Sequence, residues 1–140
     1  MTDLFTKPLI GKTISLYPFE KGYLSQLRQA AEYEEIWSYN KPSNQDLSSY
    51  LDNYFKALET SHLSESQSAY LVIRQSDKAV LGSSRFYDLS FPNKRLAIGF
   101  TWYTPSVWGT EVNPETKLLL LQHVFERLNF NRVEFQQTLI

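Results

Sequence analysis

The sequence contains no cysteine, which excludes disulfide bonds, thiolate metal sites and cysteine nucleophiles. Histidine is almost as scarce, because only His62 and His123 are present, and a histidine-rich metal site is not expected. We interpret His62 as a solvated residue of a polar loop. His123 lies within an apolar helical pattern, which favours a partly buried structural residue over a catalytic one. We therefore expect no bound metal.

Strong charge and long hydrophobic runs are also missing. A formal net charge of −1 gives no electrostatic reason to expect a nucleic acid or an anionic membrane as a partner. No apolar run approaches the length of a membrane span, and the N-terminal segment MTDLFTKPLIGK does not have the apolar core of a signal peptide. We therefore expect a cytoplasmic protein that binds neither nucleic acid nor membranes.

Aromatic residues, by contrast, are abundant at 15% of the chain, which suggests a pocket or an interface as well as a core. A length of 140 residues suffices for one domain with a hydrophobic core. No repeat, low-complexity tract or linker divides the chain. We therefore expect residues 1–140 to form a single domain.

The spacing of apolar residues predicts the order of the secondary-structure elements. Strands are predicted at 13–18, 69–74, 79–89, 96–103 and 132–135, and helices at 20–32, from Ser43 or Asn44 to about 60, and at 113–128. Short turns between the three middle strands predict antiparallel pairs, whereas the final strand–helix–strand unit forces a parallel pair. These features predict an α/β (α+β) fold with a mixed, mostly antiparallel sheet and flanking helices.

The strand at 96–103 is expected to alternate strictly between its two faces. One face would carry Leu96, Ile98, Phe100 and Trp102, and the other Ala97, Gly99, Thr101 and Tyr103. In the preceding strand, Gly82 suggests a bulge.

A loop with the sequence Trp108-Gly109-Thr110 joins this strand to the most strongly marked helix. Asn113 suits the N-cap, Pro114 suits the first turn, and Glu115 favours the positive end of the helix dipole. The predicted apolar stripe comprises Leu118, Leu121, Phe125 and Leu128, widened by Leu119, Leu120 and Val124. Unpaired N–H groups at such a helix start can bind a phosphate or pyrophosphate, although many strand–loop–helix units bind nothing.

The run IGFTWYTPSVWGTEVNPETKLLLLQHVFERLNFNRVEF resembles the central block of the GNAT family of acetyl-CoA-dependent N-acetyltransferases. The likeness is greatest to the branch with the ribosomal-protein N-terminal acetyltransferases, in which a GYTWL strand, a WGTG loop and an N-x-E-A-K-L-L-L helix follow in this order. The resemblance implies a GNAT-like sheet in which acetyl-CoA lies between two splayed parallel strands. It implies cofactor contacts from Thr101, Trp102, Tyr103, Trp108, Gly109, Thr110, Glu111, Val112 and Asn113. It also implies acceptor contacts from Trp37, Tyr39 and Arg85, and for Trp37 and Tyr39 a packing role stays equally open.

The sequence departs from the family pattern at two places. The family loop reads R/Q-x-x-G-x-G/A, whereas this chain has Ser106 at the basic or amide position and Glu111 at the second glycine. Glu111 restricts the backbone and adds a carboxylate where a pyrophosphate is expected. The chain also lacks the helix and strands that follow 132–135 in the family, so we expect a C-terminally truncated domain with an open strand edge.

The resemblance implies transfer of an acetyl group from acetyl-CoA to a primary amine, either a protein or peptide N-terminus or a small amine. Glu35, Asp88 and Glu111 are carboxylates near the expected pocket, but no spacing singles out a general base. Tyr103 is a possible proton donor, although a packed tyrosine is the more common case. A non-catalytic acyl-CoA-binding or protein-interaction module and an inactive truncated product remain as alternatives. The open edge predicts a homodimer or another homo-oligomer.

Overall fold

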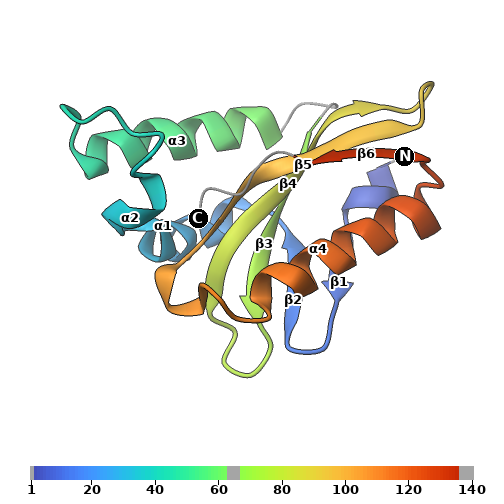
Figure 1. Ribbon diagram of the computed structural model, residues 1–140, viewed down its shortest axis with the longest axis horizontal. Coiled ribbons are helices and arrows are strands. Elements are labelled where there is room, and N and C mark those ends of the chain that lie inside the picture. The colour runs from blue at the N-terminus through green and yellow to red at the C-terminus, as the bar shows by residue number, and fades with distance from the viewer. Residues whose placement is uncertain (1, 63–66, 136–140) are drawn as a thin grey trace.

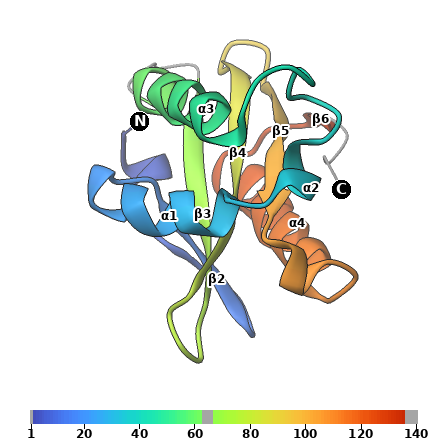
Figure 2. The same cartoon turned by 90° about the vertical axis from the view of Figure 1, so that its left-hand side faces the viewer.

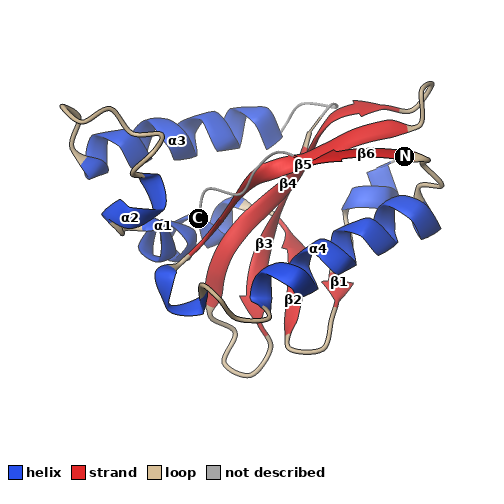
Figure 3. Ribbon diagram, in the orientation of Figure 1, coloured by secondary structure: helices blue, strands red, loops and turns tan. Residues whose placement is uncertain are grey.

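The computed structural model describes residues 2–62 and 67–135, which form a mixed sheet with helices on both faces (Figure 3). The six strands lie in the sheet in the order of the chain. Their bounds are Leu9–Ile10 for β1, Ile14–Pro18 for β2, Ser68–Arg74 for β3, Val80–Ser90 for β4, Arg95–Tyr103 for β5 and Arg132–Phe135 for β6. All five predicted strands are therefore present, and the short β1 is an addition.

The pairing of the strands confirms the predicted fold class. Strands β1 to β5 pair antiparallel, each with the next, whereas β6 pairs parallel with β5. Helix α4, Val112–Gln122, connects these last two strands, and a crossover of this kind makes them parallel. The sheet is therefore mixed and mostly antiparallel.

The helices cover opposite faces of the sheet (Figures 1 and 2). On one face lie α1, Leu24–Ala31, α2, Glu34–Trp37, and α3, Leu47–His62; on the other lies α4. Two clusters of buried side chains fill the spaces between these layers. The α3-side cluster includes Trp37, Leu51, Phe55, Leu71 and Trp102, and the α4-side cluster includes Leu16, Val72, Phe86, Ile98, Leu120 and Val124. No helix in the described part of the chain is long and apolar enough to cross a membrane.

The predicted cap of the second helix is wrong by a few residues. Helix α3 begins at Leu47 rather than directly after Ser43 or Asn44. The carboxylate of Asp46 accepts a hydrogen bond of 3.0 Å from the backbone N–H of Ser49, which is the usual geometry of an N-cap residue. The side chain of His62, at the other end of this helix, and the chain end from 136 lie outside the described residues.

The prediction that Asn113 caps the next helix is also wrong. Helix α4 begins at Val112, so Asn113 lies within its first turn, and the N-cap position is taken by Glu111, whose side chain makes no capping hydrogen bond. The side-chain oxygen of Asn113 instead accepts a hydrogen bond of 2.7 Å from the hydroxyl of Tyr103 on β5. The polar side chain therefore joins helix α4 to the sheet rather than capping the helix.

The apolar stripe of α4 differs from the predicted one. Thr116, Leu119 and Leu120 face the core, whereas Leu118 and Phe125 are 55% and 49% exposed. Because consecutive leucines occupy 118–121, the sequence does not define one apolar face. The helix also continues into a π-helical turn, His123–Arg127, which shifts the face that its last residues present to the sheet.

A β-bulge in β5 breaks the alternation that was predicted for this strand. Ser83 pairs with Trp102 and Arg85 with Gly99, so Phe100 and Thr101 together face Ser84. Beyond this bulge the two faces exchange: Trp102 belongs to the α3-side cluster, and Tyr103 joins Ile98 in the α4-side cluster. The extra residue reverses the side-chain alternation, and the predicted placement of Phe100, Trp102 and Tyr103 is therefore wrong.

Candidate functional site

The loop before α4 carries backbone N–H groups that the protein does not use. The N–H groups of Trp108, Thr110 and Val112 donate to Pro105, to Val107 and to the hydroxyl of Thr110, respectively. Among the described residues, those of Gly109, Glu111 and Asn113 have no acceptor. Because the start of a helix is positively polarised, donors in this arrangement suit a phosphate or pyrophosphate chemically.

Local contacts fix the shape of this loop. Gly109 adopts a φ of 74°, in the left-handed region that favours glycine. The indole N–H of Trp108 donates a hydrogen bond of 2.8 Å to the carbonyl of Tyr103, so the loop is tied to the end of β5. The hydroxyl of Thr110 donates to Val107 and accepts from Val112. The free donors are therefore held in a defined arrangement.

A second region of unused backbone lies along β5. Strands β5 and β6 pair from Arg95 with Arg132 to Ile98 with Phe135, and within the described residues the ladder extends no further. Among the residues that the structure describes, the β5 segment from Gly99 to Tyr103 pairs only with β4. A ligand between the two strands can therefore meet backbone groups of β5, as at the carboxyl ends of parallel strands in other α/β folds.

The side chains of this β5 segment point into the protein layers. Thr101 and Trp102 are 4% and 0% exposed, and their polar atoms bond to Ser84 and Tyr54, respectively. Tyr103 is 1% exposed. These three predicted cofactor residues can therefore contribute mainly their backbone groups to a ligand at the β5 edge.

Two of the remaining loop residues differ from the family pattern, and both face outwards. Glu111 and Ser106 are exposed, whereas Val112 is buried beneath the first turn of α4. With φ at −74°, the backbone of Glu111 needs no glycine at the position where the family has one. The glutamate is therefore compatible with the loop, and its carboxylate stays in water near the free donors.

The residues predicted to contact an acceptor occupy different environments. Trp37 is 1% exposed, its indole N–H donates to the carbonyl of Ala31, and its ring packs 5.5 Å from that of Trp102. Tyr39, in contrast, is 92% exposed. Arg85 is buried on β4 beside the bulge, where its guanidinium lies 4.1 Å from the centre of the Phe100 ring. The structure thus joins Trp37 to β5 and leaves Tyr39 at the surface.

Sequence reasoning missed the hydrogen-bonding roles of Tyr54 and Glu115. The Tyr54 hydroxyl accepts a hydrogen bond of 3.1 Å from the indole of Trp102, and burial raises the pKa of Tyr54, although the nearby Arg85 charge and hydrogen bonds oppose this. The Glu115 carboxylate accepts backbone hydrogen bonds from Lys12 at 2.6 Å and from Thr13 at 2.9 Å. The position of Glu115 in the first turn was visible in the sequence, but its partners lie about a hundred residues earlier.

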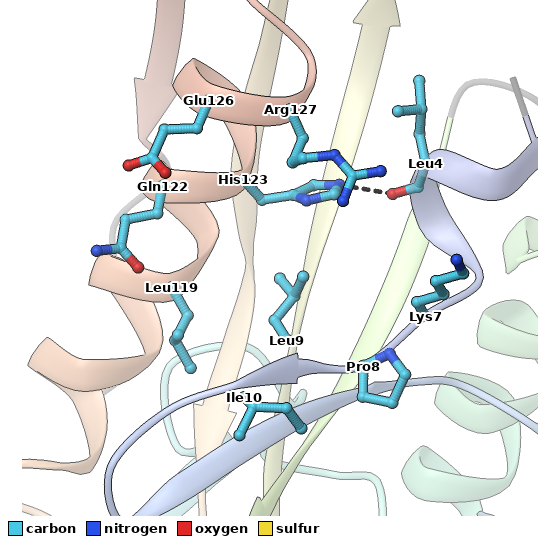
Figure 4. A pocket seen from close by; sticks show the side chains of 10 residues that line it. All are labelled: Leu4, Lys7, Pro8, Leu9, Ile10, Leu119, Gln122, His123, Glu126 and Arg127. Atoms are coloured by element: carbon cyan, nitrogen blue, oxygen red, sulfur yellow. Dashed lines mark hydrogen bonds between the residues drawn. The ribbon is translucent and has the colours of Figure 1, made fainter.

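A separate pocket of about 290 Å³ lies between the N-terminal segment and the last turns of α4 (Figure 4). Its lining includes Leu4, Leu9, Leu119 and Arg127, and His123, whose Nε2 lies 2.6 Å from the carbonyl of Leu4. This pocket is formed at the C-terminal end of α4, whereas the free N–H groups surround the N-terminal end. Within the described ranges, no group of three or more acidic or histidine side chains is arranged to hold a metal ion.

The geometry defines a mixed α/β fold in which a parallel strand pair lies beside a helix start with free backbone donors. A sequence profile of the acetyltransferase (GNAT) domain matches residues 14–137. The chain therefore belongs to the GNAT acetyltransferase family. Comparison with curated proteins gives no match.

Solved structures support the same fold. A GCN5-related N-acetyltransferase from Brucella melitensis is 18% identical with a TM-score of 0.76, over 91% of this chain and 58% of that one. RimL, a ribosomal L7/L12 alpha-N-protein acetyltransferase in complex with coenzyme A, is 17% identical with a TM-score of 0.73, over 92% of this chain and 73% of that one. The chain spans only 64% and 58% of the full length of two of the similar solved chains.

Proposed function

We propose that this chain binds acetyl-CoA and transfers its acetyl group to a primary amine. The observation that carries the proposal is the pair of unused backbone regions, at Gly109–Asn113 and along β5 from Gly99 to Tyr103. The first suits the pyrophosphate of acetyl-CoA, and the second suits its extended pantetheine arm and thioester. Family membership supports this assignment.

In the proposed reaction, a neutral amine attacks the thioester carbonyl, a C–N bond forms, and the C–S bond breaks to release the thiolate. Backbone N–H groups near Thr101–Tyr103 would stabilise the developing oxyanion. Tyr103 is a poor proton donor for the thiolate, because burial raises its pKa and because its hydroxyl already donates to Asn113. We therefore propose that the thiolate takes its proton from water or from the attacking amine.

The acceptor that we favour is the α-amine of a protein or peptide. The WGT loop and the NPETKLLLL helix support it, because they resemble the ribosomal-protein N-terminal branch, and one similar structure is an alpha-N-protein acetyltransferase. Small amines are the competing class. The high pKa of Tyr103 and its bond to Asn113 are the observations that favour a non-catalytic acyl-CoA-binding module instead.

Calorimetry and a transfer assay test the proposal together. Acetyl-CoA is titrated into the purified chain, and the release of free CoA thiol is then followed with a panel of amine-terminated peptides, small amines and an N-acetylated control peptide. Binding with transfer to the free peptides supports the proposed function. Binding without transfer to any amine supports the non-catalytic module, and the absence of binding refutes both.

Two substitutions at Glu111 test the pyrophosphate site. Glu111→Gly removes the carboxylate and should tighten acetyl-CoA binding by a factor of roughly two to five, the range for an exposed charge interaction. Glu111→Pro also removes the carboxylate, and proline accepts the φ of −74°, but it deletes a free N–H donor. Glu111→Pro should therefore bind acetyl-CoA more weakly than Glu111→Gly. Equal affinity for the two variants would show that this N–H does not contact the cofactor.

We also propose that a second copy of the chain covers β6. Among the described strands β6 is at the edge of the sheet, and Phe135 is 49% exposed. Exposed strand edges with apolar side chains favour pairing with another chain. Light scattering should give a dimer mass for the wild type and a monomer mass for Phe135→Lys. The matched control, Phe125→Lys on the exposed face of the last helical turn, should remain a dimer, and a monomeric wild type would refute the proposal.

A further inference from the structure

The β5 bulge, formed by Phe100 and Thr101 opposite Ser84, has an unfavourable backbone conformation. Phe100 adopts a φ of 53°, in the left-handed region that a bulky side chain rarely occupies. The bulge begins two residues after Ile98, the last β5 residue that pairs with the described part of β6. The strained conformation of Phe100 therefore lies just beyond the described part of the ladder between β5 and β6.

Side chains of β4 contact the bulge on both faces of the sheet. On one face, the hydroxyls of Ser84 and Thr101 lie 2.7 Å apart in a buried hydrogen bond. On the other face, the guanidinium of Arg85 lies 4.1 Å from the centre of the Phe100 ring. The Tyr87 ring meets the same phenyl ring edge-on, at 5.2 Å between centroids and 76° between planes. Side chains of β4 thus contact the bulge on both faces of the sheet, and two of them meet the ring of the strained residue.

The guanidinium of Arg85 is itself held by side chains from α3 and from the segment just before β3. It donates hydrogen bonds of 3.0 Å to the hydroxyl of Ser61, in α3, and of 3.1 Å to the side-chain carbonyl of Gln67, just before β3. Arg85 is 6% exposed, and none of the ion pairs in the described part of the chain includes it. Its position is therefore set by neutral hydrogen-bond acceptors on one side and by the aromatic ring on the other.

We propose that Arg85 and Phe100 are positioning residues for the acetyl-CoA site, because their stacking holds the β5 bulge in its left-handed conformation. The bulge in turn fixes the direction of the backbone groups in the β5 segment from Gly99 to Tyr103, which the proposed function assigns to the pantetheine arm and thioester. This inference rests on the proposed function, because that function supplies the ligand, acetyl-CoA. The contacts of Arg85 and Phe100 are those of the ligand-free structure. Neither side chain takes part in the chemical step.

The proposal predicts energetic coupling between Arg85 and Phe100. Arg85→Met keeps the length of the side chain but removes its charge and planar stacking. In the ligand-free chain it should speed amide hydrogen exchange at Phe100 and Thr101 by about threefold to thirtyfold, the range that corresponds to a cation–π contact. Exchange at Leu71, in the central strand β3, should stay unchanged. The same substitution should have little further effect in the Phe100→Gly background, because glycine adopts the left-handed conformation without support.

Binding measurements supply the second readout. Arg85→Met should weaken the binding of acetyl-CoA more than that of free CoA, since the bulge lies at the acyl end of the proposed site and the nucleotide end binds at the α4 loop. Should Arg85→Met fail to fold, Arg85→Lys and Tyr87→Ala test the same contacts. Tyr33→Ala, which removes an exposed ring away from the bulge, is the matched control.

The outcomes separate the two proposals. One outcome is that the effects of Arg85→Met and Phe100→Gly on the amide exchange rates simply multiply in the double variant. That result would overturn the positioning role, whether or not the chain binds acetyl-CoA. Coupled exchange rates together with no acetyl-CoA binding in the wild type would overturn the proposed function and leave the structural role of the pair established. Coupled exchange rates with selective loss of acetyl-CoA affinity would support both.

Discussion

Glu115→Gln should destabilise the protein by about 2 kcal/mol, because the carboxylate accepts two short charge-assisted backbone hydrogen bonds that a neutral amide oxygen accepts more weakly. The donors are the N–H groups of Lys12 and Thr13, at 2.6 and 2.9 Å, and the hydroxyl of Thr13 donates to the other carboxylate oxygen. A bond of 3.3 Å from Ile14 adds little. Each short bond is assigned a loss of about 1 kcal/mol, the difference between a charged and a neutral hydrogen-bond acceptor.

Thermal and denaturant unfolding measure this effect. For a chain of this size, a loss of about 2 kcal/mol should lower the Tm by roughly 6–8 °C. Glu126→Gln is the matched control, since the exposed side chain of Glu126 makes no hydrogen bond or ion pair with the described residues. The unfolding free energy of this variant should differ from that of the wild type by less than about 0.5 kcal/mol. Equal Tm values for Glu115→Gln and the wild type would refute the role of this carboxylate as an anchor.

The pH dependence gives a further check on Glu115. Burial raises the pKa of this carboxyl, but the hydrogen bonds from Thr13, Ile14 and Lys12 outweigh it, and the pKa lies below the ordinary value of 4.5. The stabilisation is therefore fully present above about pH 4.5 and is lost as the pH falls through the folded-state pKa. In acid, the difference in unfolding free energy between the wild type and Glu115→Gln should shrink.

Three other substitutions have defined outcomes. Asn113→Ala should cost about 1–2 kcal/mol because it leaves the buried hydroxyl of Tyr103 without its acceptor, and adding Tyr103→Phe should recover much of the loss in urea unfolding. Burial lowers the pKa of His123 below 6.5, so the wild type should lose stability as the pH falls below about 6.5, and His123→Gln should flatten this slope. Gly82→Ala should cost about 3 kcal/mol or prevent folding, because its Cβ would lie 2.1 Å from a backbone oxygen of β5, whereas Gly22→Ala, with nothing within 4 Å, should be neutral.

The order and direction of the main strands could be predicted from the sequence. Apolar runs bounded by turn residues marked β3 and β4, and the strand–helix–strand pattern required the parallel pair of β5 and β6. These predictions depend on the spacing of residues along the chain, which the sequence displays directly. Gly82 also signalled an irregularity, and the register does shift beside it, between Val72 and Ile73 on the neighbouring strand.

The β5 bulge could not be predicted, because its signal is absent from the sequence. A left-handed residue is usually glycine, and Gly99 stands next to the bulge, yet Phe100 adopts the positive φ. Its ring contacts Arg85 and Tyr87, which belong to another strand. The assignment of Trp102 and Tyr103 to the wrong faces follows directly from this, since each residue after a bulge changes side.

At the candidate site, too, the sequence predicted the local motif but not the side-chain contacts, as the start of α4 at Val112 shows. Asn113 and Pro114 are common near a helix start, and the loop and helix were located correctly. The role of Asn113 was decided by Tyr103, whose hydroxyl reaches it across the layer between β5 and α4. The free donors at Gly109 and Glu111 follow from the local motif, whereas the side-chain contacts follow from tertiary packing.

The Glu115 anchor also affects how the chain folds during synthesis. The carboxylate and its backbone donor on Lys12 are separated by 103 positions in the sequence. A ribosome releases the β1–β2 hairpin long before α4 has emerged, so in the nascent chain the donors of the 12–14 turn can bond only to water. Local pairing of β3, β4 and β5 can precede this contact, whereas docking of the hairpin turn onto α4 requires nearly the whole chain. We therefore expect the N-terminal hairpin to be among the last parts to become resistant to proteases as translation proceeds.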